Sequence, residues 1–145
     1  MRVPADVVVY DEIGQLLVFA EVRGQAETTE QWAAEVRREV LASAKKFVPR
    51  YFLVIARDFT YFWLTAVPVD VLPDTKIATD DLFRTYFRSV DSTAGSINYS
   101  SMDLLVGIWL QELTEQNPRA LEALPPEFDL AKAVENGRIE FALAA

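Results

Sequence analysis

The sequence predicts an α/β protein in which a mixed β-sheet carries a crossover helix and is followed by a helical C-terminal half. Two runs rich in Val, Leu and aromatic residues flank a polar stretch with a glycine, which is typical of a β-hairpin. A helical pattern follows, and then two more apolar runs. A helix between two hairpins has to cross over the sheet, which favours a mixed rather than an all-parallel sheet.

The first hairpin is predicted from Asp6–Tyr10 and Leu16–Arg23. Because strand side chains alternate between the two faces of a sheet, Glu21 and Arg23 are expected to share a face with Leu17. This alternation places a carboxylate and a guanidinium side by side at the end of the second strand.

The length of the turn decides whether two acids of this hairpin meet. A loop over Glu12–Gln15, followed by residue-by-residue antiparallel pairing, places Asp6 opposite Glu21. A loop that is one residue shorter shifts the pairing and separates the two acids. We therefore expect the longer loop if the two carboxylates form a site.

The next elements complete the sheet. A helix is expected to start after Thr28 or Thr29, either of which can cap it, and to continue to about Lys46. The residues predicted on its solvated face are Glu35, Arg37, Arg38 and Glu39. The apolar runs Tyr51–Ala56 and Phe59–Val67 are expected to form a second hairpin.

Helices dominate the prediction for the C-terminal half. After a surface connection over Pro68–Lys76, the patterns predict helices over Thr79–Phe87, from Ser100 or Ser101 to about Thr114, and near Leu130–Val134, and a last strand over Ile139–Leu143. The inward stripe of the longest helix comprises Met102, Leu105, Val106, Trp109, Leu110 and Leu113. This stripe is either core or a dimer surface. We expect a single domain over residues 1–145, with an α/β core over 1–67 and a mainly helical extension over 68–145 packed on it.

Composition limits the available chemistry. The 145 residues are 51% hydrophobic and include neither cysteine nor histidine. Within this chain, disulfides, thiolate or imidazole zinc sites and the Ser-His-Asp triad are therefore excluded. Any metal held by side chains has to be an oxygen-preferring ion such as Mg²⁺ or Mn²⁺.

Charge and hydropathy indicate the compartment. The formal net charge of −8 opposes simple electrostatic binding of nucleic acid, although a local basic patch remains compatible with it. No run approaches the ~18 consecutive apolar residues of a membrane span. The acid at Asp6 argues against a secretory signal. We expect a cytoplasmic protein without a membrane partner.

Asp6 and Glu21, with Arg23 two residues further on, form a constellation suited to metal-assisted phosphodiester hydrolysis. Paired carboxylates can hold a divalent ion, which lowers the pKa of a bound water, and a nearby cation stabilises charge that develops on phosphorus. This chemistry requires neither histidine nor cysteine.

The order of these residues resembles the PD-(D/E)XK nuclease superfamily. The resemblance rests on Pro4-Ala5-Asp6, on the triplet Glu21-Val22-Arg23, on the crossover helix and on the strand Tyr51–Ala56, and it extends to about Thr65. The chain is similar in particular to nuclease-like domains related to the N-terminal part of type I restriction subunits and to Uma2-type bacterial proteins.

This resemblance implies a restriction-endonuclease-like sheet and a DNA endonuclease activity. It also implies Mg²⁺ or Mn²⁺ as cofactor, with Asp6 and Glu21 as metal ligands and Arg23 in the position of the catalytic lysine. Nucleic acid and a second copy of the chain are the partners that we consider.

Two departures from the family pattern stand out. Arg23 replaces a lysine, and a guanidinium stays protonated, so low or absent activity is one expected outcome. The family core places a helix and a strand, often with a further acid, ahead of the aspartate strand, and only five residues precede Asp6. These elements are expected to come from the C-terminal half or from a partner, or to be lacking.

Each candidate residue also has a purely structural interpretation. Glu21 and Arg23 can form an exposed salt-bridged row, Asp6 can cap a turn, and Gln31 can contact a nucleotide or hydrogen-bond its own loop. The other residues with two readings, as base- or phosphate-binding groups or as core and wetted helix face, are Tyr51, Tyr61, Trp63, Arg37, Arg38, Lys45 and Lys46. The alternative function is a catalytically inactive nuclease-like fold that acts as a binding or scaffolding module.

Overall fold

A computed structural model describes residues 5–44, 47–89 and 99–141 of the chain. The strands are β1 (Val7–Tyr10), β2 (Leu16–Val22), β3 (Tyr51–Ile55), β4 (Phe59–Trp63), β5 (Thr75–Ala78) and β6 (Arg138–Phe141). The helices are α1 (Glu30–Ser43), α2 (Thr79–Leu82), α3 (Arg84–Ser89), α4 (Tyr99–Thr114), α5 (Pro118–Leu121) and α6 (Leu130–Ala133). Pro4, Lys45, Lys46 and Leu143, on which several expectations rest, lie outside the described residues.

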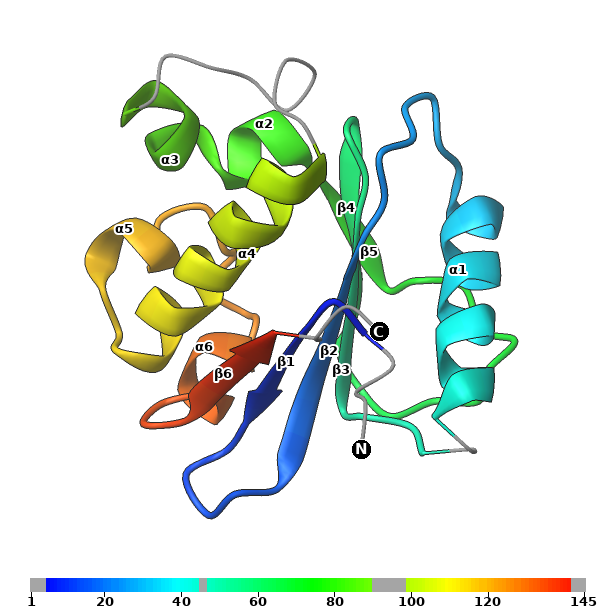
Figure 1. The fold of residues 1–145 in the computed structure, drawn as a ribbon, viewed down its shortest axis with the longest axis horizontal. Coiled ribbons are helices and arrows are strands. Elements are labelled where there is room, and N and C mark those ends of the chain that lie inside the picture. The colour runs from blue at the N-terminus through cyan, green and yellow to red at the C-terminus, as the bar shows by residue number, and fades with distance from the viewer. Residues whose placement is uncertain (1–4, 45–46, 90–98, 142–145) are drawn as a thin grey trace.

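The strands form one six-stranded sheet in the order β5-β4-β3-β2-β1-β6 (Figure 1). β2 and β3 are parallel, joined by the crossover helix α1, and every other neighbouring pair is antiparallel. The predicted α/β class, the mixed sheet and the crossover are therefore confirmed. The second half of the chain contributes both edge strands.

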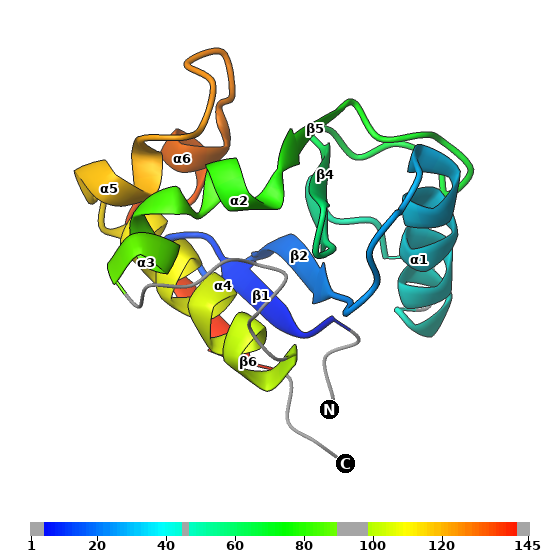
Figure 2. The same cartoon turned by 90° about the horizontal axis from the view of Figure 1, so that it is seen from above.

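Helices lie on both faces of the sheet. α1 alone covers one face, and α2 to α6 lie on the other, as the two perpendicular views agree (Figures 1 and 2). Alternate strand residues feed two separate cores: Phe19 and Val54 pack on the α1 side, and Val18 and Leu53 pack on the α4 side. The central strand β3 is buried along its whole length, as its continuous apolar run predicts.

The first turn differs from its prediction. The Asp11 N–H donates to the Gln15 carbonyl at 2.8 Å, so the loop is one residue shorter than expected, and Gly14 adopts φ +89° within it. A β-bulge at Leu17 then inserts one residue into β2, which restores the expected pairing further along, with Val7 opposite Ala20. The bulge also moves Leu17 to the α4 side, so the prediction that it shares a face with Glu21 is wrong.

Helix α1 begins as predicted, but one of its charged residues is not solvated. The Thr29 hydroxyl caps the helix by accepting from the Trp32 N–H at 3.1 Å. Arg37, expected on the wetted face, is fully buried. Its guanidinium donates to the Val67 and Pro68 carbonyls at 2.8 and 2.9 Å and lies 5.2 Å from the Trp63 ring. It anchors the connection that leaves β4, because that connection runs beside α1.

Two further segments depart from their predictions. The predicted surface connection Pro68–Lys76 contains the start of β5, which pairs with β4 at the edge of the sheet. The predicted helix Thr79–Phe87 is interrupted at Phe83, which separates α2 from α3. The inward stripe of α4, by contrast, is buried at all six positions, so Trp109 belongs to the core. In the described part of the chain, none of the helices has the length and apolar character that a membrane span requires.

Candidate functional site

The hairpin brings Asp6 beside the end of β2. Val7 pairs with Ala20, so Asp6 stands one step further on, at the position that faces Glu21. The Asp6 Oδ2 atom accepts a hydrogen bond from the Val22 N–H at 2.7 Å. This bond ties the carboxylate to β2, and the side-chain oxygen accepts from β2 at a position beyond the end of β1. The Asp6 carboxylate is thereby fixed next to Glu21.

Glu21 is a buried acid with an arginine beside it. Its residue is 8% exposed, and its Oε2 atom lies 2.9 Å from Arg23 Nε. Burial and, after it, the negative charge of Asp6 together raise the pKa of Glu21 to about 7, although Arg23 acts in the opposite direction. The arginine therefore offsets only part of the cost of placing the buried Glu21 carboxylate beside the partly buried one of Asp6.

Arg23 reaches from the sheet to the crossover helix. Its side chain is 29% exposed, and a terminal nitrogen lies 3.8 Å from Glu39 Oε2 on α1. Glu21 is two residues from Phe19 on β2, so the two side chains share a face of the sheet. Because Phe19 packs on the α1 side, the Glu21–Arg23 pair lies on the α1 face. The guanidinium is thus shared between a buried acid and an exposed one.

A third acid, which the sequence did not single out, comes from the opposite layer. Asp103 lies in the first turns of α4, and burial together with the charge of Asp6 raises its pKa to about 6. Its Oδ1 atom is buried and has no hydrogen-bond partner among the described residues. An acid next to Met102, at the border of an apolar helical stripe, was the signal that could have found it.

Asp6 therefore lies between two acids that belong to different layers of the fold. The negative charge of Asp6 raises the pKa of Glu21, which lies on the α1 side of the sheet, and the pKa of Asp103, which lies on the α4 side. Glu21 and Asp103 come from opposite faces of the sheet. The described residues contain no group of three or more acids arranged to hold a metal ion. The donors are all carboxylate oxygens and carry excess negative charge, which fits a hard divalent cation in type and charge but not as a closed ligand set.

The segment between β2 and α1 is fixed by hydrogen bonds to the β3–β4 turn. The Thr28 N–H and hydroxyl both donate to the Asp58 carboxylate at 2.7 Å, and Tyr61 OH lies 2.8 Å from the Thr28 hydroxyl. Arg57 Nε donates to the Gly24 carbonyl at 2.7 Å. This network positions the start of α1 next to the candidate site.

The remaining candidates have structural positions. The rings of Tyr51, Tyr61 and Trp63 are buried in the core, so they are not available to stack on bases. Gln31 is exposed on α1. Arg38 pairs with Glu35 at 2.9 Å on the wetted face of the helix.

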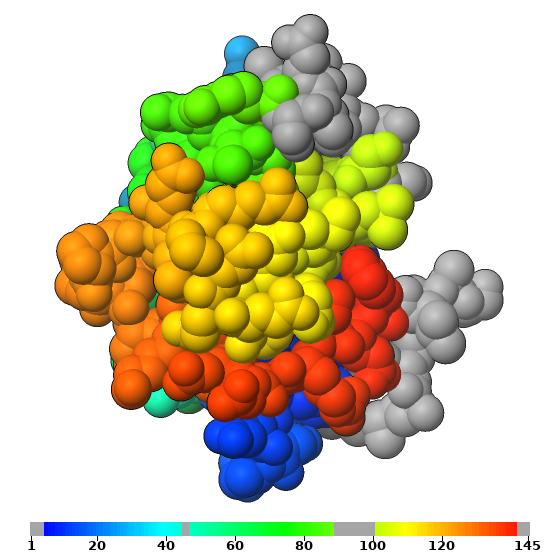
Figure 3. All heavy atoms as spheres, turned by 90° about the vertical axis from the view of Figure 1, so that its left-hand side faces the viewer, coloured from blue at the N-terminus to red at the C-terminus, as the bar shows by residue number. Residues whose placement is uncertain are grey.

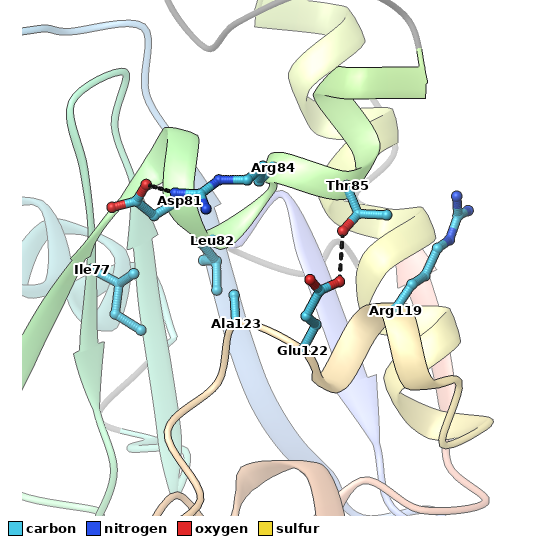
Figure 4. A pocket seen from close by; sticks show the side chains of 8 residues that line it. All are labelled: Ile77, Asp81, Leu82, Arg84, Thr85, Arg119, Glu122 and Ala123. Carbon is cyan, nitrogen blue, oxygen red and sulfur yellow. Dashed lines mark hydrogen bonds and ion pairs between the residues drawn. The ribbon is translucent and has the colours of Figure 1, made fainter.

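A separate cavity of about 250 Å³ lies between α2, α3 and α5 (Figure 4). Its polar side chains have partners: Arg84 pairs with Asp81, the Thr85 hydroxyl donates to Glu122 Oε2 at 2.9 Å, and Arg119 pairs with Glu112, which lies outside the lining. None of the acids near β2 lines it.

Comparisons of the chain with protein-family models, with curated proteins and with solved structures found no match.

Proposed function

We propose that this chain is a Mg²⁺- or Mn²⁺-dependent DNA endonuclease of the PD-(D/E)XK type, in which Asp6 and Glu21 are the metal ligands. The observation that carries the proposal is the Asp6–Glu21 pair: two carboxylates from adjacent strands, with the pKa of Glu21 raised to about 7 by burial and by its neighbour. Acids whose pKa is raised by burial and by a neighbouring charge are typical of functional sites.

The C-terminal half supports a restriction-endonuclease-like core. The family places a helix and a strand, often with an additional acid, ahead of the aspartate strand. Here β6 pairs antiparallel with β1, and α4 packs against both strands. α4 also carries Asp103, whose pKa the charge of Asp6 raises. We propose that α4 and β6 stand in for the expected elements, in a different order along the chain.

The residues of the chain divide the work in this proposal. A bound divalent ion supplies Lewis acidity and lowers the pKa of a water. Asp6, held by the Val22 N–H, and Glu21 would hold the ion, and the partly exposed guanidinium of Arg23 would donate to a non-bridging phosphate oxygen. Arg23 stays protonated, so it stabilises charge and takes no proton.

One observation favours the alternative, a catalytically inactive module that binds or scaffolds. Arg23 Nε already lies 2.9 Å from Glu21 Oε2, so a cation occupies the place in which a metal would be needed. In this alternative the ion pair between Arg23 and Glu21 is permanent, and the two acids are what remains of a former metal site. The two functions differ in whether a divalent ion can displace the arginine.

Calorimetric titration with Mn²⁺ and with Ca²⁺ tests the metal site. We expect binding by the unmodified chain and a loss of at least about tenfold in affinity, roughly 1.4 kcal/mol, in Asp6→Asn and in Glu21→Gln. Glu12→Gln, in the exposed turn, is the matched control and should bind normally. Equal binding by Asp6→Asn, or none by the unmodified chain, would sink the metal site.

A nuclease assay on plasmid and single-stranded DNA, with Mg²⁺ and with Mn²⁺, tests the activity. Arg23→Lys, which restores the family residue, is expected to cut faster than the unmodified chain. If only Arg23→Lys cuts, the chain is a decayed enzyme. If both bind metal and neither cuts, the binding module is the better description.

A further inference from the structure

β6 and α4 form an apolar edge of the molecule that the proposed site does not use. Figure 3 shows the two elements side by side on one face. Leu104 and Ile108 on α4 are 59% and 49% exposed, and Phe141 on β6 is 37% exposed. Together with Gly107 and Ile139 they line one part of a groove of about 340 Å³, whose other part is lined by Gln111, Glu112 and Glu115. Three of the seven large exposed hydrophobic side chains of the described residues thus gather in one place.

The floor of this groove is built by one close approach. The Phe141 ring lies over Gly107, where a Cβ atom would come within 2.1 Å of the ring. α4 can therefore approach β6 closely, and the side chains on either side of Gly107, Leu104 and Ile108, project past the strand. The apolar rim stands at the outer border of the sheet.

The same border has an open strand edge. Among the described residues, β6 pairs with β1 only, so the N–H and C=O groups on its other side face outward. Many proteins block such an edge with charges of one sign. β6 instead alternates signs: Arg138 and Glu140 point to one face and pair with each other at 3.2 Å, and Ile139 and Phe141 point to the other.

This pattern is complementary to itself. If two β6 strands pair antiparallel about a two-fold axis through Ile139, each Arg138 stands opposite Glu140 of the other copy, and the two Ile139 side chains face each other. The axis is perpendicular to the sheet, so both α4 helices lie on the same face and flank it. Leu104 and Ile108 of each copy then point towards those of the other across the β6 strands.

We propose that the chain forms a two-fold symmetric homodimer through β6, which joins the two sheets edge to edge and buries the apolar rims of the two α4 helices against each other. A second copy is the occupant that the charges select, because a strand with alternating Arg and Glu pairs with its own antiparallel image without placing like charges opposite each other. The inference is independent of whether the acids near β2 bind metal.

Charge reversal at β6 gives a decisive test by sedimentation equilibrium. The unmodified chain is expected to reach twice its 16.4 kDa mass at about 100 µM. Arg138→Glu places Glu opposite Glu140, and Glu140→Arg places Arg opposite Arg138, so each variant alone is expected to be a monomer. An equimolar mixture of the two should recover a dimer, since opposite charges then face each other at both positions.

The mixture also removes the main ambiguity. Both variants lose the Arg138–Glu140 pair within their own strand, and Arg138→Glu also loses its contact with the Tyr10 ring, 4.1 Å away. Mixing cannot restore these contacts, so recovery reports only contacts between chains. Asp80→Arg, an exposed charge reversal on α2, is the control and should still form a dimer.

A second variant covers the case in which charge reversal unfolds β6. Ile108→Glu leaves β6 intact and places a charge on the apolar rim, so it should raise the dimer dissociation constant at least about tenfold while the melting temperature at high dilution stays unchanged. An unmodified chain that is monomeric at about 100 µM would overturn the proposal. Dimers that persist in Arg138→Glu, or in Ile108→Glu, would place the contact elsewhere.

Discussion

Two glutamate–arginine pairs in this molecule look alike and behave in opposite ways. Glu112 on α4 accepts two hydrogen bonds from Arg119 at 2.7 Å and one from Tyr86 OH at 2.6 Å, and these interactions lower its pKa. Glu21 on β2 accepts from Arg23 at 2.9 Å, yet its pKa is raised to about 7. The presence of an arginine therefore does not decide whether a buried carboxylate is stabilised.

The neighbours of each pair explain the difference. Three hydrogen bonds from Arg119 and Tyr86 satisfy the Glu112 carboxylate. The guanidinium of Arg119 also stacks over the Tyr86 ring at 4.3 Å. Glu21 shares one arginine with Glu39 and sits beside the charge of Asp6. The first pair closes the junction of α3, α4 and α5. The second is an excess of negative charge that the fold tolerates, which is what a cation-binding site requires.

The largest effect is expected from breaking the satisfied pair. Glu112→Gln removes the charge that Arg119 and Tyr86 bind, and should lower the free energy of unfolding by about 3 kcal/mol, measured by urea denaturation at pH 7. Glu115→Gln, at an exposed residue just after the end of α4, should change it by less than about 0.5 kcal/mol. A small effect of Glu112→Gln would mean that the pair is not structural.

The raised pKa of Glu21 is expected to make the free energy of unfolding fall as pH rises. Between the ordinary pKa of 4.5 and the folded value of about 7, the folded state keeps a proton on Glu21 that the unfolded state has released. The slope of stability against pH is therefore negative in this window and levels off above about pH 7. We expect a loss of about 2 kcal/mol between pH 5 and pH 8, less than the full shift because part of the titration of the unfolded state lies below pH 5.

Glu21→Gln provides the check on this slope. Urea denaturation at pH 5 and pH 8 should give a clearly smaller loss of stability for this variant, with the remainder due to Asp103, whose pKa is raised to about 6, whereas Glu115→Gln should keep the full slope. The lowered pKa values of Asp58 and Glu112 act in the opposite direction, but only below about pH 4.5, where both carboxylates become protonated in the unfolded chain. A slope that is undiminished in Glu21→Gln would assign it to another group.

Periodicity and turn chemistry were enough to predict most of the central sheet. The alternation in β2, the continuous apolar run of β3 and the cap at Thr29 each depend on residues within one segment, so the sequence displays them directly. The hairpin register was correct for the wrong reason, because a shorter turn and a bulge at Leu17 cancel each other. Bulges depend on packing against both faces, which no local pattern reveals.

The site was only partly predictable, for the same reason. Asp6 and Glu21 face each other through a local hairpin, and counting residues paired them only because the bulge offsets the shorter turn. Asp103 approaches Asp6 only because β6 and α4 return from the far end of the chain to the edge of β1. Arg37 was misplaced because its partners, the carbonyls of Val67 and Pro68, lie about thirty positions away along the chain.

The smallest of the three effects on stability should come from a substitution of Asp103. The sign of this effect shows whether Asp103 is a satisfied acid, as Glu112 is, or a destabilising one, as Glu21 is. Its buried Oδ1 atom has no partner among the described residues, and Asp6 repels its charge. Asp103→Asn removes that charge and adds an NH₂ donor, which a carboxylate lacks. It should raise the free energy of unfolding by about 1 kcal/mol at pH 8, a modest gain because the residue is partly exposed to solvent.

The gain in Asp103→Asn should vanish near pH 4, because the native carboxyl of Asp103, with a pKa of about 6, is then protonated in the unmodified chain as well. Asp70→Asn, an exposed acid 3.7 Å from Arg38, is the control and should show neither the gain nor the pH dependence. If Asp103→Asn is instead destabilising to the extent of Glu112→Gln, Asp103 has a stabilising partner and belongs with the satisfied acids. The negative charge near β2 would then come from Asp6 and Glu21 alone, and a divalent ion bound there would have two carboxylate ligands from the chain rather than a third acid within reach.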